Sequence, residues 1–335
     1  KGKYIRAING RYANTCHFES ENVNKLIVIG GATATGKSDL AISIAEEIGA
    51  EIINADSMQL YKGMDIGTAK LTVEERQGIP HELIDILSVR EDSNASFYQG
   101  KAREVVDRLL LAGTPVVVVG GTGLYIKSLL DDLNFPETDP VIRAKLELEA
   151  LSIGADALHK RLSELDPAAA MAIPRENIRR VVRALEVIEI TGKPFTANLP
   201  RKDSTKYPEA KQFGLRIDRS ALDERIDARV EKMWADGFED EVEKLISEGL
   251  LEGTTAKAAI GYSHILTVKG IASDLEKAGV ELQPGDRVDA REATKVATRQ
   301  YARRQETWFN RDERIHWLSS EPREWVFEVL KAVSG

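Results

Sequence analysis

A glycine-rich segment of eight residues, set between an apolar run and a helical pattern, constrains the fold of this chain more than any other feature. The segment runs from Gly31 to Ser38 with the sequence GATATGKS, and it matches the pattern G-x-x-x-x-G-K-[ST]. Residues 26–29 are apolar and predict a buried strand, whereas residues 39–48 carry apolar side chains at helical spacing. In such a strand–loop–helix unit, backbone N–H groups and the helix N-terminus point at phosphate oxygens. The sequence therefore predicts a phosphate-binding loop.

The side chains of this loop have separate expected roles. We expect Lys37 to neutralise the outer phosphate and the Ser38 hydroxyl to contact Mg²⁺, the one cofactor that the sequence predicts. A glycine-rich turn without a ligand is the alternative interpretation, and the loop alone leaves open which phosphate compound it holds. The residues expected to bind phosphate groups are Gly31, Thr33, Ala34, Thr35, Gly36, Lys37 and Ser38.

Strands and helices alternate over residues 25–130. Strands are expected at 51–54, 81–87 and 116–119, with an amphipathic helix over 96–112. This alternation predicts an α/β fold, a P-loop NTPase-like parallel sheet core with helices on both faces. Asp56 follows the strand at 51–54, so its carboxylate is expected in the ligand crevice at the carboxyl ends of the strands.

The strand signal fades beyond Pro136, which predicts a second module. Helices are expected from Asp139 to Ser152, directly after Asp166-Pro167, and from Glu176 to Thr191. One more strand is expected at 213–217, followed by a mainly helical C-terminal part. We therefore expect a core of residues 25–136 and 177–335, a small helical insertion of residues 137–176, and an extension without ordered structure at 1–24.

Composition restricts the surroundings of the chain. Its 335 residues include one cysteine, Cys16, so neither an internal disulfide nor a cysteine-built zinc site can form within it. No apolar run approaches the roughly 20 residues that span a membrane, and residues 1–24 lack the apolar stretch of a secretory signal. We expect a cytoplasmic monomer without membrane contact. The net charge of −8 argues against a uniformly nucleic-acid-binding surface but permits a local basic groove.

Basic residues gather on three predicted helices. Two arginines lie four positions apart, hence on one face, of the helix expected from Leu222 to Asp236. A run of four cations at strict i, i+4 spacing lies on a later helix and has no acidic partner on its own stripe. Each group is interpreted either as a solvated face or as a contact for an anion. The groups are Arg179, Arg180 and Arg183; Arg225 and Arg229; and Arg291, Lys295, Arg299 and Arg303.

Several blocks together resemble one family, the bacterial tRNA dimethylallyltransferases. The most specific block is DSMQLYKGMDIGTAK, fifteen residues that begin at Asp56. The resemblance extends over roughly residues 25–318, with Ala32 where the family usually has proline. The other blocks are the phosphate-binding loop, 81–86, 120–125, 183–187, 237–242, 259–262 and 298–305.

The resemblance implies transfer of a dimethylallyl group from dimethylallyl diphosphate to N6 of adenine 37, next to the tRNA anticodon. The phosphate-binding loop would then hold the diphosphate, and the helical insertion would grip the anticodon stem. Asp56 would accept the proton from the attacking amine, while Thr122 and Arg229 would bind the diphosphate and help it leave. The residues that the resemblance assigns to tRNA are Asp56, Ser57, Met58 and Gln59 around the flipped-out adenine, and Arg179, Arg180 and Arg183 on one helix.

Three other functions share part of this pattern. A small-molecule kinase would use the same loop with ATP but would not need the block that begins at Asp56. A non-enzymatic nucleotide switch would leave Asp56 and Thr122 without a task. An enzyme that prenylates free adenine nucleotides to make cytokinin shares the loop and the aspartate. The Asp-Ser-Met-Gln form of the motif, the insertion and the basic helices favour tRNA.

Overall fold

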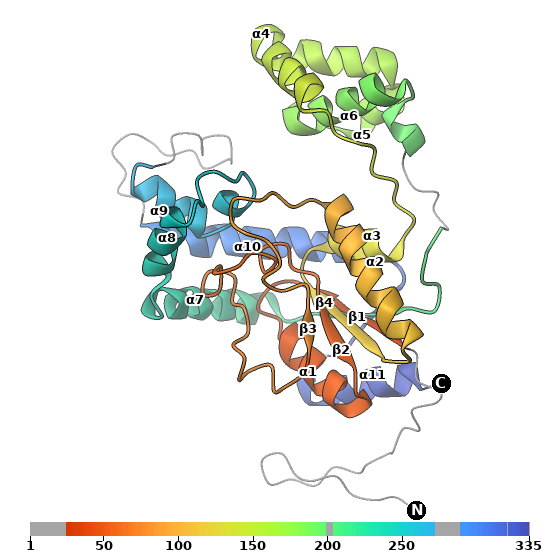
Figure 1. Cartoon of the computed structure of the whole chain (residues 1–335), viewed down its shortest axis with the longest axis vertical. Coiled ribbons are helices and arrows are strands. Elements are labelled where there is room, and N and C mark those ends of the chain that lie inside the picture. The colour runs from red at the N-terminus through yellow and green to blue at the C-terminus, as the bar shows by residue number, and fades with distance from the viewer. Residues whose placement is uncertain (1–24, 199–203, 272–288, 320, 335) are drawn as a thin grey trace, which may run out of the picture. The chain divides into compact units, whose positions relative to one another are not determined.

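The computed structural model describes residues 25–198, 204–271, 289–319 and 321–334, so the predicted extension at 1–24 lies outside the described residues (Figure 1). The chain forms two compact units. One combines Lys1–Leu129 with Tyr207–Gly335, and the other is Leu130–Lys206.

A six-stranded parallel sheet forms the centre of the larger unit. Its strands are β1 (Leu26–Gly31), β2 (Glu51–Asn54), β3 (His81–Glu82), β4 (Val116–Gly120), β5 (Lys211–Leu215) and β6 (Ile315–Trp317), in the order β3-β2-β4-β1-β5-β6. Every neighbouring pair is parallel. The continuous apolar runs of β1 and β4 suit strands that are buried on both faces. The predicted α/β core is confirmed, and the carboxyl ends of its strands meet at one edge.

Helices cover both faces of this sheet. On one face, α1 (Lys37–Ile48) and α11 (Trp325–Val333) pack on a cluster that includes Ile27, Ile29 and Ile52. Alternate side chains of a strand point to opposite faces, so Val28 and Val118 point to the other side. There, α2 (Ala95–Leu111) contacts β4, α10 (Ala290–Phe309) contacts β1, and α3 (Gly123–Leu130) follows β4.

The helical C-terminal part of the larger unit is also confirmed. It contains α7 (Arg219–Ala235), α8 (Phe238–Ser247), α9 (Tyr262–Val268) and α10, with α7 packed against α10. Short 3₁₀ helices occupy Ala256–Ala258 and Pro322–Glu324 of this unit and Phe195–Asn198 of the smaller unit. No helix in the described ranges is long and apolar enough to cross a membrane.

Two strand predictions differ from the structure. The strand expected at 81–87 ends after Glu82, because Leu83 and Asp85 adopt positive φ angles of 60° and 58° that break the extended backbone. The C-terminal part, expected to be helical, also contributes β6, which pairs with β5 at the edge of the sheet.

The smaller unit is a helical bundle of its own. It contains α4 (Pro140–Leu165), which is kinked at Gly154 where φ is 82°, α5 (Pro167–Ala172) and α6 (Ile178–Thr191). Leu146 and Leu162 of α4 pack with Val181 and Leu185 of α6. Because α6 buries its apolar face against α4, the unit extends over Leu130–Lys206 and is wider than the insertion expected at 137–176.

Candidate active site

The segment after β1 has the geometry of an anion cradle. Gly36 precedes α1 with a φ of 94°, and Ala34 also adopts a left-handed conformation with a φ of 62°. No side chain caps the N-terminus of α1, so the first N–H groups of the helix remain available to a ligand. Within the loop, the Thr35 hydroxyl and the Lys37 ammonium donate to the Ala32 carbonyl at 2.8 and 2.5 Å. These contacts hold the loop in its curved form.

A cavity that is open to solvent lies against this loop. Its apolar wall includes Ile52, Leu71 and Ile84. Polar groups of several segments that are distant in sequence converge on the same space, which suits a ligand with one anionic and one apolar end. Of the predicted site residues, the lining includes Thr33, Ala34, Gly36, Lys37, Ser38, Asp56, Gln59 and Arg229, whereas Gly31, Thr35, Ser57, Met58 and Thr122 are outside it.

Two cations and a carboxylate determine the electrostatics of the cavity. Burial, together with the neighbouring Arg229 guanidinium, lowers the pKa of Lys37 to about 7, although Asp56 opposes this shift. Burial raises the pKa of Asp56 above its ordinary value of 3.8, and the nearby cations only partly offset it. Arg229 of α7 reaches the loop directly, donating to the Thr33 hydroxyl at 3.2 Å. The site therefore combines an anion-binding end with a carboxylate of increased basicity.

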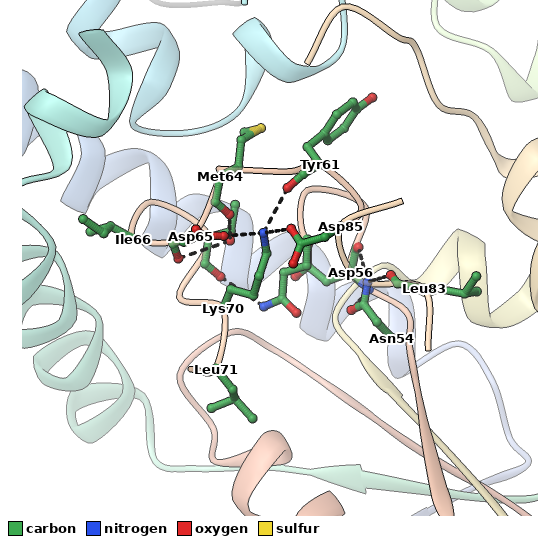
Figure 2. A network of polar contacts seen from close by, with 12 residues as sticks. Asn54, Asp56, Tyr61, Met64, Asp65, Ile66, Lys70, Leu71, Leu83 and Asp85 are labelled. Atoms are coloured by element: carbon green, nitrogen blue, oxygen red, sulfur yellow. Dashed lines mark hydrogen bonds and ion pairs between the residues drawn. The ribbon is translucent and has the colours of Figure 1, made fainter. Parts of the chain in front are cut away.

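The position of Asp56 depends on the buried Asn54 at the end of β2. The Asn54 amide donates to the backbone carbonyls of Asp56 and Leu83 at 2.9 and 3.0 Å, and its oxygen accepts the Asp56 N–H (Figure 2). The Asp56 carboxylate in turn accepts the Met58 N–H at 2.9 Å. The turn thus fixes the carboxylate at the edge of the sheet.

A buried lysine organises the rest of the block that begins at Asp56. The Lys70 ammonium binds Asp65 at 2.5 Å, Asp85 at 2.6 Å and the Tyr61 carbonyl at 2.9 Å, and its side chain is only 3% exposed (Figure 2). Three acceptors match the three donors of an ammonium group, so the buried charge is compensated. Lys70 therefore holds the loop after β2 against the segment after β3.

Glu241 of α8 fastens the same loop from the other side. Its carboxylate accepts the N–H groups of Asp65, Ile66 and Gly67 at 3.0, 2.7 and 3.1 Å. The Tyr262 hydroxyl donates to it at 2.5 Å. Glu241 and Tyr262 belong to the blocks 237–242 and 259–262 that resemble the family, and these contacts show that both blocks support the loop after β2.

Thr122 joins the site through its neighbours. Its hydroxyl accepts the Ser57 N–H at 3.1 Å and donates to the Ser57 hydroxyl at 3.4 Å. Burial, reinforced by Asp56, raises the pKa of Tyr301 of α10 to about 12, while the neighbouring Thr122 side chain opposes this shift. The loop after β4 is thereby tied to the turn that carries Asp56.

Known proteins are similar to this chain over most of its length, including the segments that line the cavity. The IPP transferase family matches residues 59–312, more than half of the chain. The chain belongs to the IPP transferase family. Curated relatives named tRNA dimethylallyltransferase include that of Streptomyces griseus, 51% identical over 300 residues that cover 90% of this chain and 92% of the relative. The Thermobifida fusca relative is 52% identical over 301 residues, covering 88% and 90% of the two chains.

Solved structures agree with this assignment to the IPP transferases. The tRNA isopentenylpyrophosphate transferase of Bacillus halodurans has a TM-score of 0.63 and 34% identity, covering 93% of this chain and 96% of that one. A eukaryotic dimethylallyltransferase acting on tRNA has a TM-score of 0.71 and 27% identity, covering 89% and 74%. The family and the fold predicted from the sequence are both confirmed, and the chain is a transferase.

The donors of this IPP transferase fit a magnesium ion that takes most of its ligands from a substrate. Among the residues that the structure describes, no group of three or more His, Cys, Asp or Glu side chains could hold a metal. Ser38 and Asp39 at the start of α1 and Asp56 line the cavity beside Lys37. Mg²⁺ usually keeps water and phosphate oxygens and binds few protein groups, so this sparse donor set is adequate.

The arginines of α6 divide into two kinds. Arg179 and Arg180 are exposed. The Arg183 guanidinium instead donates to the buried Glu186 at 2.8 Å and to the carbonyls of Pro136 and Glu137 at 2.7 and 3.2 Å. Arg183 therefore holds the start of the smaller unit together, which is a structural task that the sequence did not reveal.

The basic stripe of α10 has acidic partners on a neighbouring helix. Arg291 pairs with Glu231 of α7 at 3.1 Å, and Lys295 pairs with the same carboxylate and with Glu292. Arg299 pairs with Asp227. The sequence shows no acidic residue on the stripe itself. The partners come from α7, whose carboxylates lie opposite the stripe because the two helices pack together.

Gln305 is the main residue of the site region to which the sequence assigned no role. It lies on α10, is 5% exposed, and hydrogen-bonds with two separate loops of the site. The available signal was the position of Gln305 at the end of the block 298–305, which resembles the family.

Proposed function

We propose that this chain transfers a dimethylallyl group from dimethylallyl diphosphate to N6 of adenine 37 in tRNA. The observation that carries the proposal is one cavity in which Lys37 and Arg229 meet Asp56 beside an uncapped helix N-terminus. The relatives named tRNA dimethylallyltransferase, and the structure titled as a dimethylallyltransferase acting on tRNA, support tRNA as the acceptor. A cytoplasmic location follows from this substrate.

In the proposed reaction, a new N6–C1 bond forms while the bond between C1 and the diphosphate oxygen breaks. The leaving diphosphate gains negative charge, which Lys37, Arg229 and the N–H groups at the start of α1 stabilise. Ser38 would hold a magnesium ion, which would neutralise further charge of the diphosphate. Asp56 accepts the proton that the amine loses, and its raised pKa makes it a stronger base than an ordinary carboxylate.

We propose that the acceptor base leaves its stack to reach this cavity, because an amine inside a stacked loop is poorly accessible. Gln59 lines the cavity and is oriented by its contact to the Thr68 carbonyl at 3.2 Å, so it is a candidate to contact the adenine. The exposed Arg179 and Arg180 of the smaller unit are candidates for contacts to tRNA phosphates.

The deciding experiment incubates the protein with Mg²⁺, labelled dimethylallyl diphosphate and either unmodified tRNA or AMP. Label in tRNA at the adenine beside the anticodon is the expected result. Label in AMP alone would assign the chain to cytokinin synthesis, and transfer to neither acceptor would reject prenyl transfer. A parallel reaction with ATP labelled at its γ-phosphate tests for the kinase alternative.

A further inference from the structure

The buried amide of Gln305 connects two loops that the chemistry needs in a fixed relation. Its Oε1 accepts the Thr33 N–H of the phosphate-binding loop at 2.9 Å, and its Nε2 donates to the Gly121 carbonyl of the loop after β4 at 2.8 Å. Only this orientation of the amide matches both partners, because the opposite orientation would face donor with donor and acceptor with acceptor. One side chain thus closes two separate hydrogen bonds.

The two bonded loops carry different parts of the site. The Thr33 hydroxyl accepts a hydrogen bond from the Arg229 guanidinium, so the phosphate-binding loop contacts α7 at Thr33. Gly121 directly precedes Thr122, whose hydroxyl contacts Ser57 in the turn after Asp56. A shift of one loop against the other would therefore separate the diphosphate-binding groups from the segment that carries the base.

Neighbouring glycines make the close approach of α10 possible. A Cβ atom at Gly121 would lie 2.2 Å from the Gln305 Nε2. At Gly30 and Gly123, a Cβ atom would lie 2.7 Å from Phe309 and 2.0 Å from Trp308 of the same helix. All three distances are shorter than a real contact permits, so these glycines allow α10 to reach the ends of β1 and β4. The helix therefore approaches the two loops as closely as the amide bridge requires.

We propose that Gln305 is a positioning residue, which holds the phosphate-binding loop and the Thr122 loop in the relation that transfer requires. The inference rests on the proposed function for its readout of rate but not for its readout of structure. Gln305 touches neither reacting group, so its loss should slow the chemical step more than it weakens binding of pyrophosphate. A displacement of about 1 Å in an active site can reduce the rate by roughly 100-fold.

The first test compares the wild type with Gln305→Met, which preserves side-chain length but removes both hydrogen bonds. We expect the single-turnover rate to fall by about 10- to 100-fold, while the affinity for inorganic pyrophosphate with Mg²⁺ changes by less than about threefold. Gln300→Met is the matched control, because Gln300 is exposed on the same helix. Equal rates in the wild type and Gln305→Met would overturn the proposal.

The second test uses Gln305→Glu, whose protonation decides whether it can bridge the loops. An ionised glutamate can accept the Thr33 N–H but repels the Gly121 carbonyl, whereas a protonated one supplies one acceptor and one donor, as glutamine does. The rate of Gln305→Glu relative to wild type should therefore rise as the pH falls. The titratable or charged groups around this contact are Tyr301 of α10, Arg229 of α7, Lys37 at the start of α1 and Asp56 in the turn after β2. Taking the ratio of the two rates cancels the titration that these groups share in both proteins.

A ratio that stays flat with pH would contradict the bridging role. Amide hydrogen exchange at Thr33 tests the bridge without any prenyl transfer, so it distinguishes a failure of the positioning role from a failure of the proposed function. If the wild type transfers no prenyl group, the Thr33 N–H must still exchange faster in Gln305→Met than in the wild type and in Gln300→Met. Unchanged exchange at Thr33 would overturn the positioning role by itself.

Discussion

Replacing Asp56 with asparagine separates the proton-accepting role of this residue from its structural one. Asparagine keeps an oxygen that can accept the Met58 N–H, a hydrogen bond that is 2.9 Å long in the structure. The backbone contacts of Asp56 to Asn54 do not involve the altered side chain. The variant should therefore fold as the wild type does and differ only in its inability to take up a proton.

The expected loss follows from the role of a general base. Such groups contribute about 10²- to 10⁴-fold to the rate, so the single-turnover rate of Asp56→Asn should fall by at least about 100-fold. Rates are measured with saturating dimethylallyl diphosphate, Mg²⁺ and tRNA, and tRNA binding is measured separately. Asp240→Asn, which alters an exposed carboxylate of α8, is the control.

The pH dependence provides a second check on the same residue. Asp56 must be ionised to accept a proton, and its pKa is raised by burial. The wild-type rate should therefore decline with falling pH, beginning above the range in which an ordinary aspartate titrates. This acid limb should be absent from the residual activity of Asp56→Asn. Retention of more than about a tenth of the wild-type rate would refute the assignment of Asp56 as the base.

Three further predictions concern binding. Lys37→Met should weaken the binding of inorganic pyrophosphate. The advantage of the wild type over this variant should shrink as the pH rises above about 7, because Lys37 then loses its ammonium form. Calorimetry at several pH values measures both effects. Replacing Arg179 and Arg180 with alanine should weaken tRNA binding and reduce the slope of log affinity against log salt by about 0.7 to 0.9 for each tRNA phosphate that is no longer bound, with pyrophosphate affinity unchanged. The same change at Arg291 and Arg299 should leave that slope unaltered, because carboxylates of α7 already pair with both guanidinium groups; a reduced slope would mean that these residues face tRNA.

Local signals predicted those parts of the fold that depend on neighbouring residues. The apolar runs of β1 and β4 follow from their own composition, as does the helix after the phosphate-binding loop. Asp56 was identifiable because it follows a strand, and the carboxyl ends of parallel strands meet at one edge. In contrast, the end of β3 depends on positive φ angles at Leu83 and Asp85, which no local preference indicated.

Contacts between distant segments decided the tasks of several charged residues. Arg183 and Arg179 carry the same charge and lie on the same helix. Arg179 is exposed, whereas Arg183 binds the buried Glu186 and two backbone carbonyls. The packing of α6 on α4 buries that side of the helix, which also widens the smaller unit beyond the expected bounds. The i, i+3 spacing of Arg183 and Glu186 allows their pairing within the helix, but the contacts of Arg183 to Pro136 and Glu137, which lie 47 and 46 positions away, come only from the tertiary structure.

The sequence by itself determined the glycine-rich loop before α1, the parallel sheet and the carboxylate at its edge, because these depend on residue types at fixed short spacings. Only the tertiary structure decided that Gln305 bridges Thr33 and Gly121, which lie 272 and 184 positions away in the chain. Such bonds form when α10 packs across the ends of β1 and β4, and that packing is a property of the whole core. Because a buried amide needs partners for its polar atoms and these two come from distant loops, its role becomes visible only in three dimensions.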